Sequence, residues 1–412
     1  MKILFMGIGL VHYYNLVLNR LNQLEGFEVL NVIPRNSNGH IEEGVFQTSQ
    51  GVNFRVCLLP EFSVFSLFHS FCGLPSFLRM ERPDIIVFTQ YYLPMFMFNL
   101  PVRLAVKRLK IKLIFKSIPF RLKTYGDCLE NIRTSPGAVN ISRTLTRPLL
   151  KIPWLLRLLR MAGLEYQRLS FQLPDAHVNY IKDACRIYGS YGVPRERLFV
   201  TYNSPDTDHL FQVRLKIEKE PPILPPSNCR LVHVGRLVPS KKTGMLIRAF
   251  ADVKSRFHDA ELLVIGDGPE HSRLWTLAQD LKISASVKFL GGIYDPLVLG
   301  KYLKASTAYV LAGMGGLSIN DAMIFGLPVI CSVCDGTEKV LVRDGVNGLL
   351  FEDGNRDDLV KKILSILDDP LVARRMGDRS TEIIREEINI HTVLKGYLDA
   401  FTYVMEKHSS GR

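Results

Sequence analysis

The segment YVLAGMGGLSINDAMIFGLPVI, residues 309–330, decides the fold of this chain. An apolar run opens it, a loop with Gly313, Gly315 and Gly316 follows, and a second apolar run closes it. This order predicts a buried strand, a glycine loop that begins a helix, and another buried strand. The first free N–H groups of such a helix can hold a phosphate. Asp321, one to two turns into the helix, can accept both hydroxyls of a ribose.

The same alternation of apolar runs and helix-patterned segments continues along all 412 residues. Alternating strands and helices predict parallel sheets covered on both faces, and twelve strands are too many for one domain of half this length. We therefore expect an α/β chain with two doubly wound, Rossmann-like domains that face each other across a cleft. The apolar runs are residues 2–6, 29–33, 84–88, 112–115, 177–180, 198–201, 230–234, 261–265, 287–290, 308–311, 328–331 and 348–351.

A polar and proline-rich stretch, residues 205–229, separates the two sets of strands. It predicts an N-terminal domain over residues 1–207 and a C-terminal domain over residues 208–391. Beyond these domains, apolar side chains recur at helical spacing, which predicts an amphipathic helix over residues 392–412. We expect this helix to pack back on the N-terminal domain.

The net charge of +12 comes from one part of the chain. Residues 101–168 carry 15 basic and 3 acidic side chains, which equals the excess of the whole sequence. Trp154 and Leu158 lie there beside Arg157 and Arg160, a composition that suits the headgroup region of an anionic membrane. A core-facing helix with solvated arginines is the alternative, and the sequence leaves both open. Because no nucleic-acid-binding motif accompanies the charge, we expect no nucleic acid partner.

Cysteine usage and the N-terminus bear on location. Seven cysteines without regular spacing predict no disulfide framework and fit a reducing compartment. Cys331 and Cys334 form a lone CxxC, which is a weak metal signal. The first residues, MKILFMGIGLV, lack a small-residue cleavage site, so we expect a strand there rather than a signal peptide. The sequence has no apolar run of 18 residues, so we expect no transmembrane helix.

Two further loops suit a nucleoside diphosphate. In HVGRLVPSKKTGMLIRAF, residues 233–250, Gly235 allows a tight turn after a strand, and Arg236 and Lys241 bracket the loop before a helix. Two cations in such a loop suit a diphosphate, with two solvated surface charges as the alternative. In the next loop, GDGP, Gly266 permits the close approach of a ligand, or simply a turn into a helix.

Together these segments resemble the C-terminal half of the GT-B-fold retaining glycosyltransferases of family 4, the glycosyl transferases group 1. The family pattern is a GR…K loop, a GxGP loop, a glycine-rich helix start with two acids eight positions apart, and a GLPVI strand. The resemblance spans about residues 198–370, and TYNSPDTDHLF, residues 201–211, is similar to the segment that closes the family's N-terminal domain. The N-terminal 195 residues match only in strand layout and in the loop Gly7-x-Gly9.

The resemblance implies a role for each matching residue. Arg236 and Lys241 would stabilise the leaving diphosphate, and Asp321 takes the position of the family glutamate that contacts the ribose. Backbone N–H groups of the glycine loop would contact the distal phosphate and the sugar, and Ile293 would contact the nucleobase. The implied donor-binding residues are Gly7, Gly9, Gly235, Gly266, Ile293, Gly313, Gly315, Gly316, Leu317 and Ser318.

Departures from the family pattern bear on activity. The family's first glutamate, which contacts the donor sugar, falls at Gly313, which implies altered donor selection or lost activity. Asp321 is shorter than the family glutamate. The acceptor-side histidine of the family has no counterpart, because KSIPFR, residues 116–121, occupies its position. His12, next to the N-terminal glycine loop, is a candidate for acceptor contact, or else a structural histidine.

We therefore expect an enzyme: a retaining hexosyltransferase that moves a sugar from a UDP- or GDP-linked donor to a glycan or lipid-linked acceptor. The expected pathway class is surface polysaccharide or lipopolysaccharide biosynthesis. A catalytically weakened nucleotide-sugar-binding or regulatory subunit is the alternative, supported only by Gly313. A nucleotide-sugar epimerase is disfavoured, because the cleft segments hold few acids and histidines.

We expect neither a cofactor nor a metal. Asp206-Thr207-Asp208 is a DxD motif, which binds manganese in a different glycosyltransferase fold, but Arg236 and Lys241 already supply positive charge here. The expected location is cytoplasmic, with peripheral attachment at the inner face of the membrane through residues 101–168.

Overall fold

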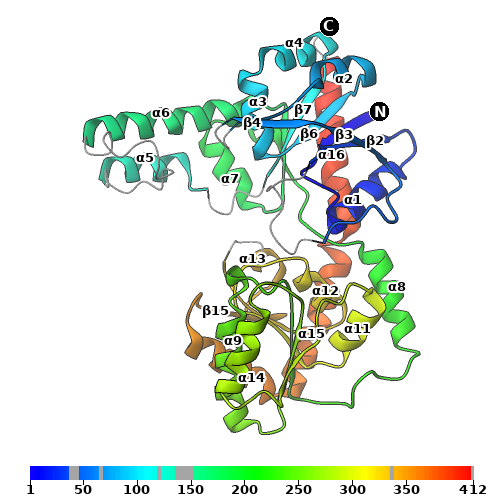
Figure 1. Cartoon of the computed structure of the whole chain (residues 1–412), viewed down its shortest axis with the longest axis vertical. Helices are drawn as coiled ribbons and strands as arrows, with labels where there is room; N and C mark the ends of the chain where they lie inside the picture. The colour runs from blue at the N-terminus through cyan, green and yellow to red at the C-terminus, as the bar shows by residue number, and fades with distance from the viewer. Residues whose placement is uncertain (37–45, 65–67, 118–121, 135–152, 335–337, 410–412) are drawn as a thin grey trace.

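The computed structural model describes residues 1–36, 46–64, 68–117, 122–134, 153–334 and 338–409. They form two α/β domains stacked along the long axis of the molecule (Figure 1). Each domain contains one parallel sheet with helices on both faces. The predicted fold class is confirmed.

The N-terminal sheet has seven parallel strands in the order β3-β2-β1-β6-β7-β8-β9. An antiparallel hairpin of β4 and β5 stands apart from it. The apolar runs of the sequence do not include β3, whose side chains are only partly buried because it forms the edge of the sheet. The strands are β1 (Lys2–Met6), β2 (Glu28–Pro34), β3 (Arg55–Leu59), β4 (Glu61–Val64), β5 (Phe68–Phe71), β6 (Ile85–Phe88), β7 (Lys112–Ser117), β8 (Ala176–Asn179) and β9 (Leu198–Val200).

Helices cover both faces of this sheet, and two of them, α5 and α6, project from the domain as an arm (Figure 1). None of the helices in the described ranges is both long and apolar enough to cross a bilayer. The helices are α1 (His12–Asn22), α2 (Leu74–Glu81), η1 (Gln90–Tyr92), α3 (Leu93–Phe98), α4 (Leu100–Leu109), α5 (Tyr125–Thr134), α6 (Pro153–Gln172), α7 (Asp183–Ser190) and η3 (Arg195–Arg197).

The C-terminal sheet has six parallel strands in the order β12-β11-β10-β13-β14-β15. The strand order reverses between β10 and β13, and ligands of such sheets bind outside the carboxyl ends at this point. The strands are β10 (Arg230–Val234), β11 (Glu261–Ile265), β12 (Val287–Phe289), β13 (Ala308–Leu311), β14 (Val329–Ser332) and β15 (Gly348–Phe351). The helices are α8 (Thr207–Ile217), η4 (Pro239–Lys241), α9 (Thr243–Arg256), α10 (His271–Asp280), α11 (Pro296–Lys304), α12 (Ser318–Ile324), α13 (Glu338–Leu341), α14 (Arg356–Leu367) and α15 (Pro370–Glu386).

Burial on both faces explains why these strands consist of continuous apolar runs. Each sheet separates two apolar clusters, and every residue of β6, β13 and β14 is buried. Parallel sheets covered by helices show this pattern, whereas half-exposed strands alternate. The switch point of the C-terminal sheet is therefore held by a packed core on either side.

The chain crosses between the domains twice. It passes from β9 to α8, and it returns from α15 to the last helix, α16 (Ile390–Ser409), which packs on β7, β8, β9 and α1 of the N-terminal domain. Tyr397 and Phe401 of α16 are fully buried there. We retain residues 1–207 and 208–391 as the proposed domains.

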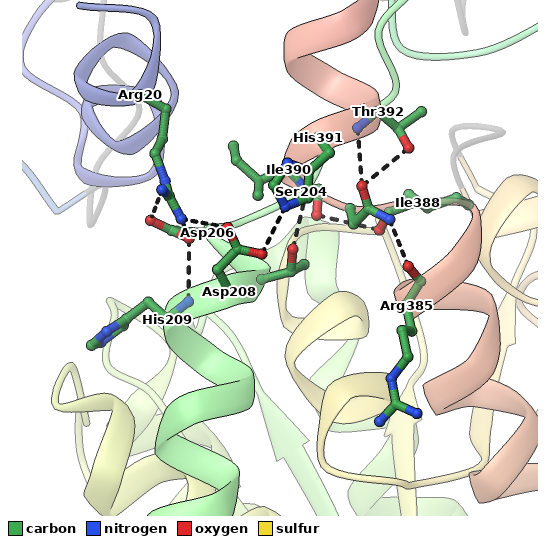
Figure 2. Close-up of polar contacts among 12 residues, drawn as sticks. Arg20, Ser204, Asp206, Asp208, His209, Arg385, Ile388, Ile390, His391 and Thr392 are labelled. Carbon is green, nitrogen blue, oxygen red and sulfur yellow. Dashed lines mark hydrogen bonds and ion pairs between the residues drawn. The ribbon is translucent and has the colours of Figure 1, made fainter. Parts of the chain in front are cut away.

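Polar contacts join the two crossings (Figure 2). Ser204 Oγ donates to Ile388 O at 3.4 Å, and the Ile390 N–H donates to Thr207 Oγ1 at 3.1 Å. The carboxylates of the DxD motif are also engaged: Arg20 donates to Asp206 and Asp208, and His391 Nε2 lies 3.0 Å from Asp208 Oδ1. The motif thus lies between a helix of the N-terminal domain and the start of α16.

Candidate active site

The loops after β10 and β11 contact each other at two glycines. The Gly235 N–H donates to Ile265 O at 2.9 Å, and a Cβ on Gly266 would lie 1.9 Å from Gly235 O. Gly266 also has a φ of +145°, which other residues rarely adopt. Packing at the carboxyl ends of the strands therefore requires Gly266. Contact of either glycine with a donor stays a prediction.

Lys241 joins the loop after β10 to the glycine loop after β13. The residue is only 7% exposed, and its Nζ donates to Met314 O at 2.8 Å and to Gly315 O at 2.7 Å. A buried ammonium group is unfavourable without such partners. Its charge thus lies at the loop where the sequence predicts the diphosphate. Arg236, a mostly buried residue, lies in the same loop between β10 and α9.

Gly313 packs against the backbone of the Lys241 loop. A Cβ at this position would lie 2.3 Å from Ser240 O and 2.7 Å from the carbonyl carbon of Lys241. The next residue, Met314, donates its N–H to Ser240 O at 2.9 Å. No side chain fits at Gly313 without a shift of the backbone, so packing explains why a glutamate is missing here.

A carboxylate reaches the same loop from another element. Glu338, the first residue of α13, is fully buried, and its Oε1 accepts the Gly315 N–H at 2.9 Å. Local sequence patterns mark Glu338 only as the start of a short helix and not as a site residue. Since the Gly315 N–H is already bonded, it is not open to a phosphate in this structure.

Asp321 of α12 is a mostly buried acid, and burial raises its pKa to about 7. Among the described residues, its carboxylate makes no hydrogen bond and no ion pair. Ser318, at the start of the same helix, differs, because its Oγ lies 2.7 Å from the Tyr309 hydroxyl. A buried acid without a partner and with a strongly raised pKa is typical of a functional site.

The N-terminal domain approaches the same region through aromatic rings. His12 opens α1, partial burial lowers its pKa, and its ring centroid lies 5.7 Å from that of Phe46. Phe46 stacks on Tyr294 of the C-terminal domain, with ring centroids 4.5 Å apart. Because Tyr294 follows Ile293, the candidate acceptor residue His12 and the candidate base contact Ile293 lie at one junction between the domains.

The N-terminal glycine loop is tightly packed. Gly7 donates its N–H to Val32 O at 2.9 Å, and a Cβ on Gly7 would lie 2.8 Å from Asn31 Oδ1. Gly9 is buried in the same loop. Of the KSIPFR segment, only Lys116 and Ser117 are described, so residues 118–121 lie outside the described residues.

Comparison with known proteins identifies the fold. Residues 216–383 match the family model described as glycosyl transferases group 1. The structure of Anabaena HepE in complex with UDP is 17% identical to this chain, with a TM-score of 0.64 over 98% of this chain and 100% of that chain. The fold is GT-B.

Curated relatives match about half of this GT-B chain. N-acetyl-alpha-D-glucosaminyl L-malate synthase of Bacillus anthracis is 26% identical over 222 residues, which are 53% of this chain and 57% of that protein. The lipopolysaccharide core biosynthesis glycosyltransferase LpsE of Rhizobium meliloti is 28% identical over 171 residues, 41% of this chain and 48% of that protein. The chain thus spans about half the length of the curated relatives it matches. Residues 216–383, which belong to the C-terminal half of the chain, are thus similar to the group 1 glycosyltransferases.

Proposed function

We propose that this GT-B protein is a retaining hexosyltransferase of family 4 that transfers a sugar from a UDP- or GDP-linked donor to a glycan or lipid-linked acceptor. The observation that carries the proposal is that Lys241 Nζ donates to the loop of residues 313–316 at the switch point of β10 and β13, directly before α12, the helix that contains Asp321. The LpsE relative acts in lipopolysaccharide core biosynthesis, and HepE was solved with UDP, which supports the same substrate classes here.

Charge placement gives the proposed chemistry its physical basis. Negative charge develops on the leaving diphosphate as the glycosidic C–O bond breaks, and Lys241 and Arg236 would stabilise it. Ionised Asp321 would accept hydrogen bonds from the ribose hydroxyls. Two side-chain cations meet the diphosphate in this scheme, so we propose that the reaction requires neither a metal ion nor a cofactor.

The alternative of a non-catalytic subunit depends on Gly313 alone. Packing against Ser240 accounts for this glycine, and Glu338 brings a carboxylate to Gly315 in the same loop. We therefore propose an enzyme rather than a non-catalytic subunit.

The proposal is tested by incubation of the purified protein with single UDP- and GDP-sugars, with and without an extract of glycans and lipid-linked sugars. Release of nucleoside diphosphate that depends on both one donor and the extract would support it. NMR of the product would then give the anomeric configuration, which must equal that of the donor. The proposal would be contradicted if none of the donors released nucleoside diphosphate, with or without the extract, or if the product had the inverted anomeric configuration.

We also propose peripheral attachment to the inner leaflet through the arm of α5 and α6, from a cytoplasmic location. On α6, Trp154 is 67% exposed and Leu158 is 59% exposed beside the exposed Arg157, whereas Leu156 and Leu164 are buried. A helix that buried all its apolar side chains in the core would leave only arginines outside, so these exposures support a membrane face. Figure 1 shows that the arm projects from the domain.

Co-sedimentation with vesicles of phosphatidylglycerol and phosphatidylcholine, at low and high salt, tests this attachment. A triple variant with Trp154→Ser, Leu158→Ser and Arg157→Glu should bind at least tenfold more weakly, because each basic residue near an anionic leaflet contributes about 1 kcal/mol. Leu371→Ser removes a still more exposed leucine from the C-terminal domain and should change nothing. Equal binding of the triple variant and the control would reject the arm as the membrane face.

A further inference from the structure

Lys116 and Thr89 each follow the last paired residue of neighbouring strands, at the carboxyl edge of the N-terminal sheet. Thr89 follows β6, Lys116 is the fifth residue of β7, and the parallel pairing of the two strands extends to the preceding pair, Phe88 and Phe115. The two phenylalanine rings face the cluster under α3 and α6. Because successive side chains of a strand alternate, Lys116 and Thr89 share the opposite face, toward α1 and α16.

The ammonium group of Lys116 is surrounded by aromatic rings rather than by acids. Its Nζ lies 3.4 Å from the ring centroid of Tyr14 on α1 and 5.4 Å from that of Tyr180, which follows β8. Tyr397 of α16 completes the surroundings through a hydrogen bond with the Tyr14 hydroxyl. No carboxylate of the described residues lies within ion-pair distance of Lys116. Burial lowers the pKa of Lys116 to about 7.

Thr89 adds an independent observation. Its Oγ1 is buried and has no hydrogen-bond partner among the described residues. An ammonium group without a counter-charge and a hydroxyl without a partner are both unfavourable when buried, and folded proteins rarely keep such groups. Two of them at neighbouring positions indicate that a ligand supplies the missing acceptor.

The location indicates which ligand this is. Ligands of doubly wound sheets bind at the carboxyl ends of the strands, and this edge belongs to the N-terminal domain, across from the proposed donor site. Tyr14 lies two residues after His12, whose ring contacts Phe46 at the junction between the domains. The unsatisfied pair is therefore on the acceptor side of the cleft.

We propose that Lys116 and Thr89 form a binding site for an oxyanion of the acceptor, a phosphoryl or carboxylate group. Naming the acceptor as the ligand's source rests on the proposed function, whereas the anion site itself does not. The Lys116 ammonium supplies the charge, and the Thr89 hydroxyl donates the second hydrogen bond. Tyr14 holds the ammonium in place through its ring.

NMR of the full chain with ¹³C-labelled lysine side chains tests the site without any transfer reaction. The Lys116 resonance is assigned by its loss in Lys116→Gln and by its titration near neutral pH. Inorganic phosphate, which stands for a phosphoryl ligand, and acetate, which stands for a carboxylate ligand, are added separately. The anion that the site binds should shift the Lys116 resonance saturably and raise the apparent pKa of Lys116. Lys112, on the same strand and face but paired near Asp175 at the opposite end, is the internal control and should not respond.

Thr89→Val keeps the shape of the site and removes the hydroxyl. It should raise the dissociation constant of the bound anion about fivefold, the scale of one hydrogen bond. The pKa of Lys116 should stay below that of the other lysines. A Lys116 resonance that ignores both anions, or one that responds equally in Thr89→Val, would overturn the proposal. If the anion binds but no donor is ever turned over, the proposed function fails and the anion site stands.

Discussion

Arg20 donates from Nε and from one Nη to the two carboxylate oxygens of Asp206, at 2.9 and 2.8 Å. Arg20 belongs to α1 of the N-terminal domain, and Asp206 caps α8, which packs on α11 and α12 of the C-terminal sheet. The pair therefore joins α1 to the segment in which the chain crosses between the domains (Figure 2).

We predict that Arg20→Met lowers the stability of the protein by about 1 kcal/mol at pH 7, as expected for a bidentate, partly buried pair. Burial alone would raise the pKa of Asp206, but the hydrogen bonds from Arg20 and from the His209 N–H outweigh it and hold the pKa below 3.8. An acid whose pKa is lower in the folded state stabilises the folded protein at pH values above its unfolded pKa. This stabilisation is lost as the pH falls through the folded-state pKa. The deficit should therefore be complete at pH 7 and shrink below pH 4 in calorimetric scans.

Lys395→Met is the control for this variant. Lys395 pairs with Asp399 at 2.6 Å on the exposed side of α16, within one domain. Its loss should cost less than about 0.5 kcal/mol. An equal loss in both variants would show that the Arg20–Asp206 pair has no special part in joining the domains.

Lys241→Ala should lower turnover by about 10²-fold or more, the scale of one lost charge-stabilising donor. Arg236→Ala should act alike. Lys242→Ala is the neighbouring control, because Lys242 pairs with Asp353 at the surface and should leave turnover unchanged. Steady-state rates of diphosphate release decide the point, and near-normal turnover of Lys241→Ala would remove it from the proposed machinery.

Asp321→Asn should separate stability from binding. The folded-state pKa of about 7 lies above the unfolded value of 3.8, so the ionised acid disfavours folding as the pH rises from 3.8 through 7. The variant should therefore melt higher than the wild type at pH 8, with little difference at pH 4. It should also bind a nucleoside diphosphate about tenfold more weakly, measured by calorimetric titration. Unchanged affinity at pH 8 would argue against the ribose contact.

The affinity of the wild type for a nucleoside diphosphate should also depend on pH. In the proposed mechanism the ionised form of Asp321 accepts the ribose hydrogen bonds, so affinity should rise between pH 6 and pH 8 and level off above. The Asp321→Asn variant should lose most of this rise. A pH profile that is the same in both proteins would contradict the assignment.

Gly313→Ala should destabilise the C-terminal domain by about 2 kcal/mol or more, since the new Cβ would lie 2.3 Å from Ser240 O. Gly163→Ala is the matched control, because this glycine lies inside α6 with open space around its Cβ position. It should gain about 0.5–1 kcal/mol through helix propensity. Denaturant titration of both variants tests the packing explanation for the missing glutamate.

Removal of divalent metal by EDTA should leave transfer unchanged, because in the proposed mechanism side-chain cations stabilise the diphosphate. Loss of activity that manganese alone restores would bring Asp206 and Asp208 back as ligands. The double variant Asp206→Asn, Asp208→Asn loses the Arg20 ion pair whether or not these residues bind metal. If they bind manganese, addition of manganese to the EDTA-treated double variant should no longer restore activity.

Local patterns were enough to predict most strands and the order of loops in the C-terminal domain. Burial on both faces makes a parallel strand a continuous apolar run, so the runs at residues 261–265 and 308–311 coincide with β11 and β13. The edge strand β3 lacks this burial, and its sequence carried no comparable signal. The glycine loops at strand ends could also be predicted from the sequence, because the tight turn from a strand into the next helix requires glycine within a few residues.

Tertiary structure alone decided the contacts between distant residues. Glu338 reaches Gly315 across 23 positions, and Arg20 reaches Asp206 across 186. Lys116 and Thr89 occupy neighbouring register positions only because β6 and β7 pair. No local period encodes such contacts, since they depend on strand order and on the angle between the domains. Whether a charge is paired, buried or left for a ligand is likewise set by what the fold places around it, as the contrast of Lys241 with Lys116 shows.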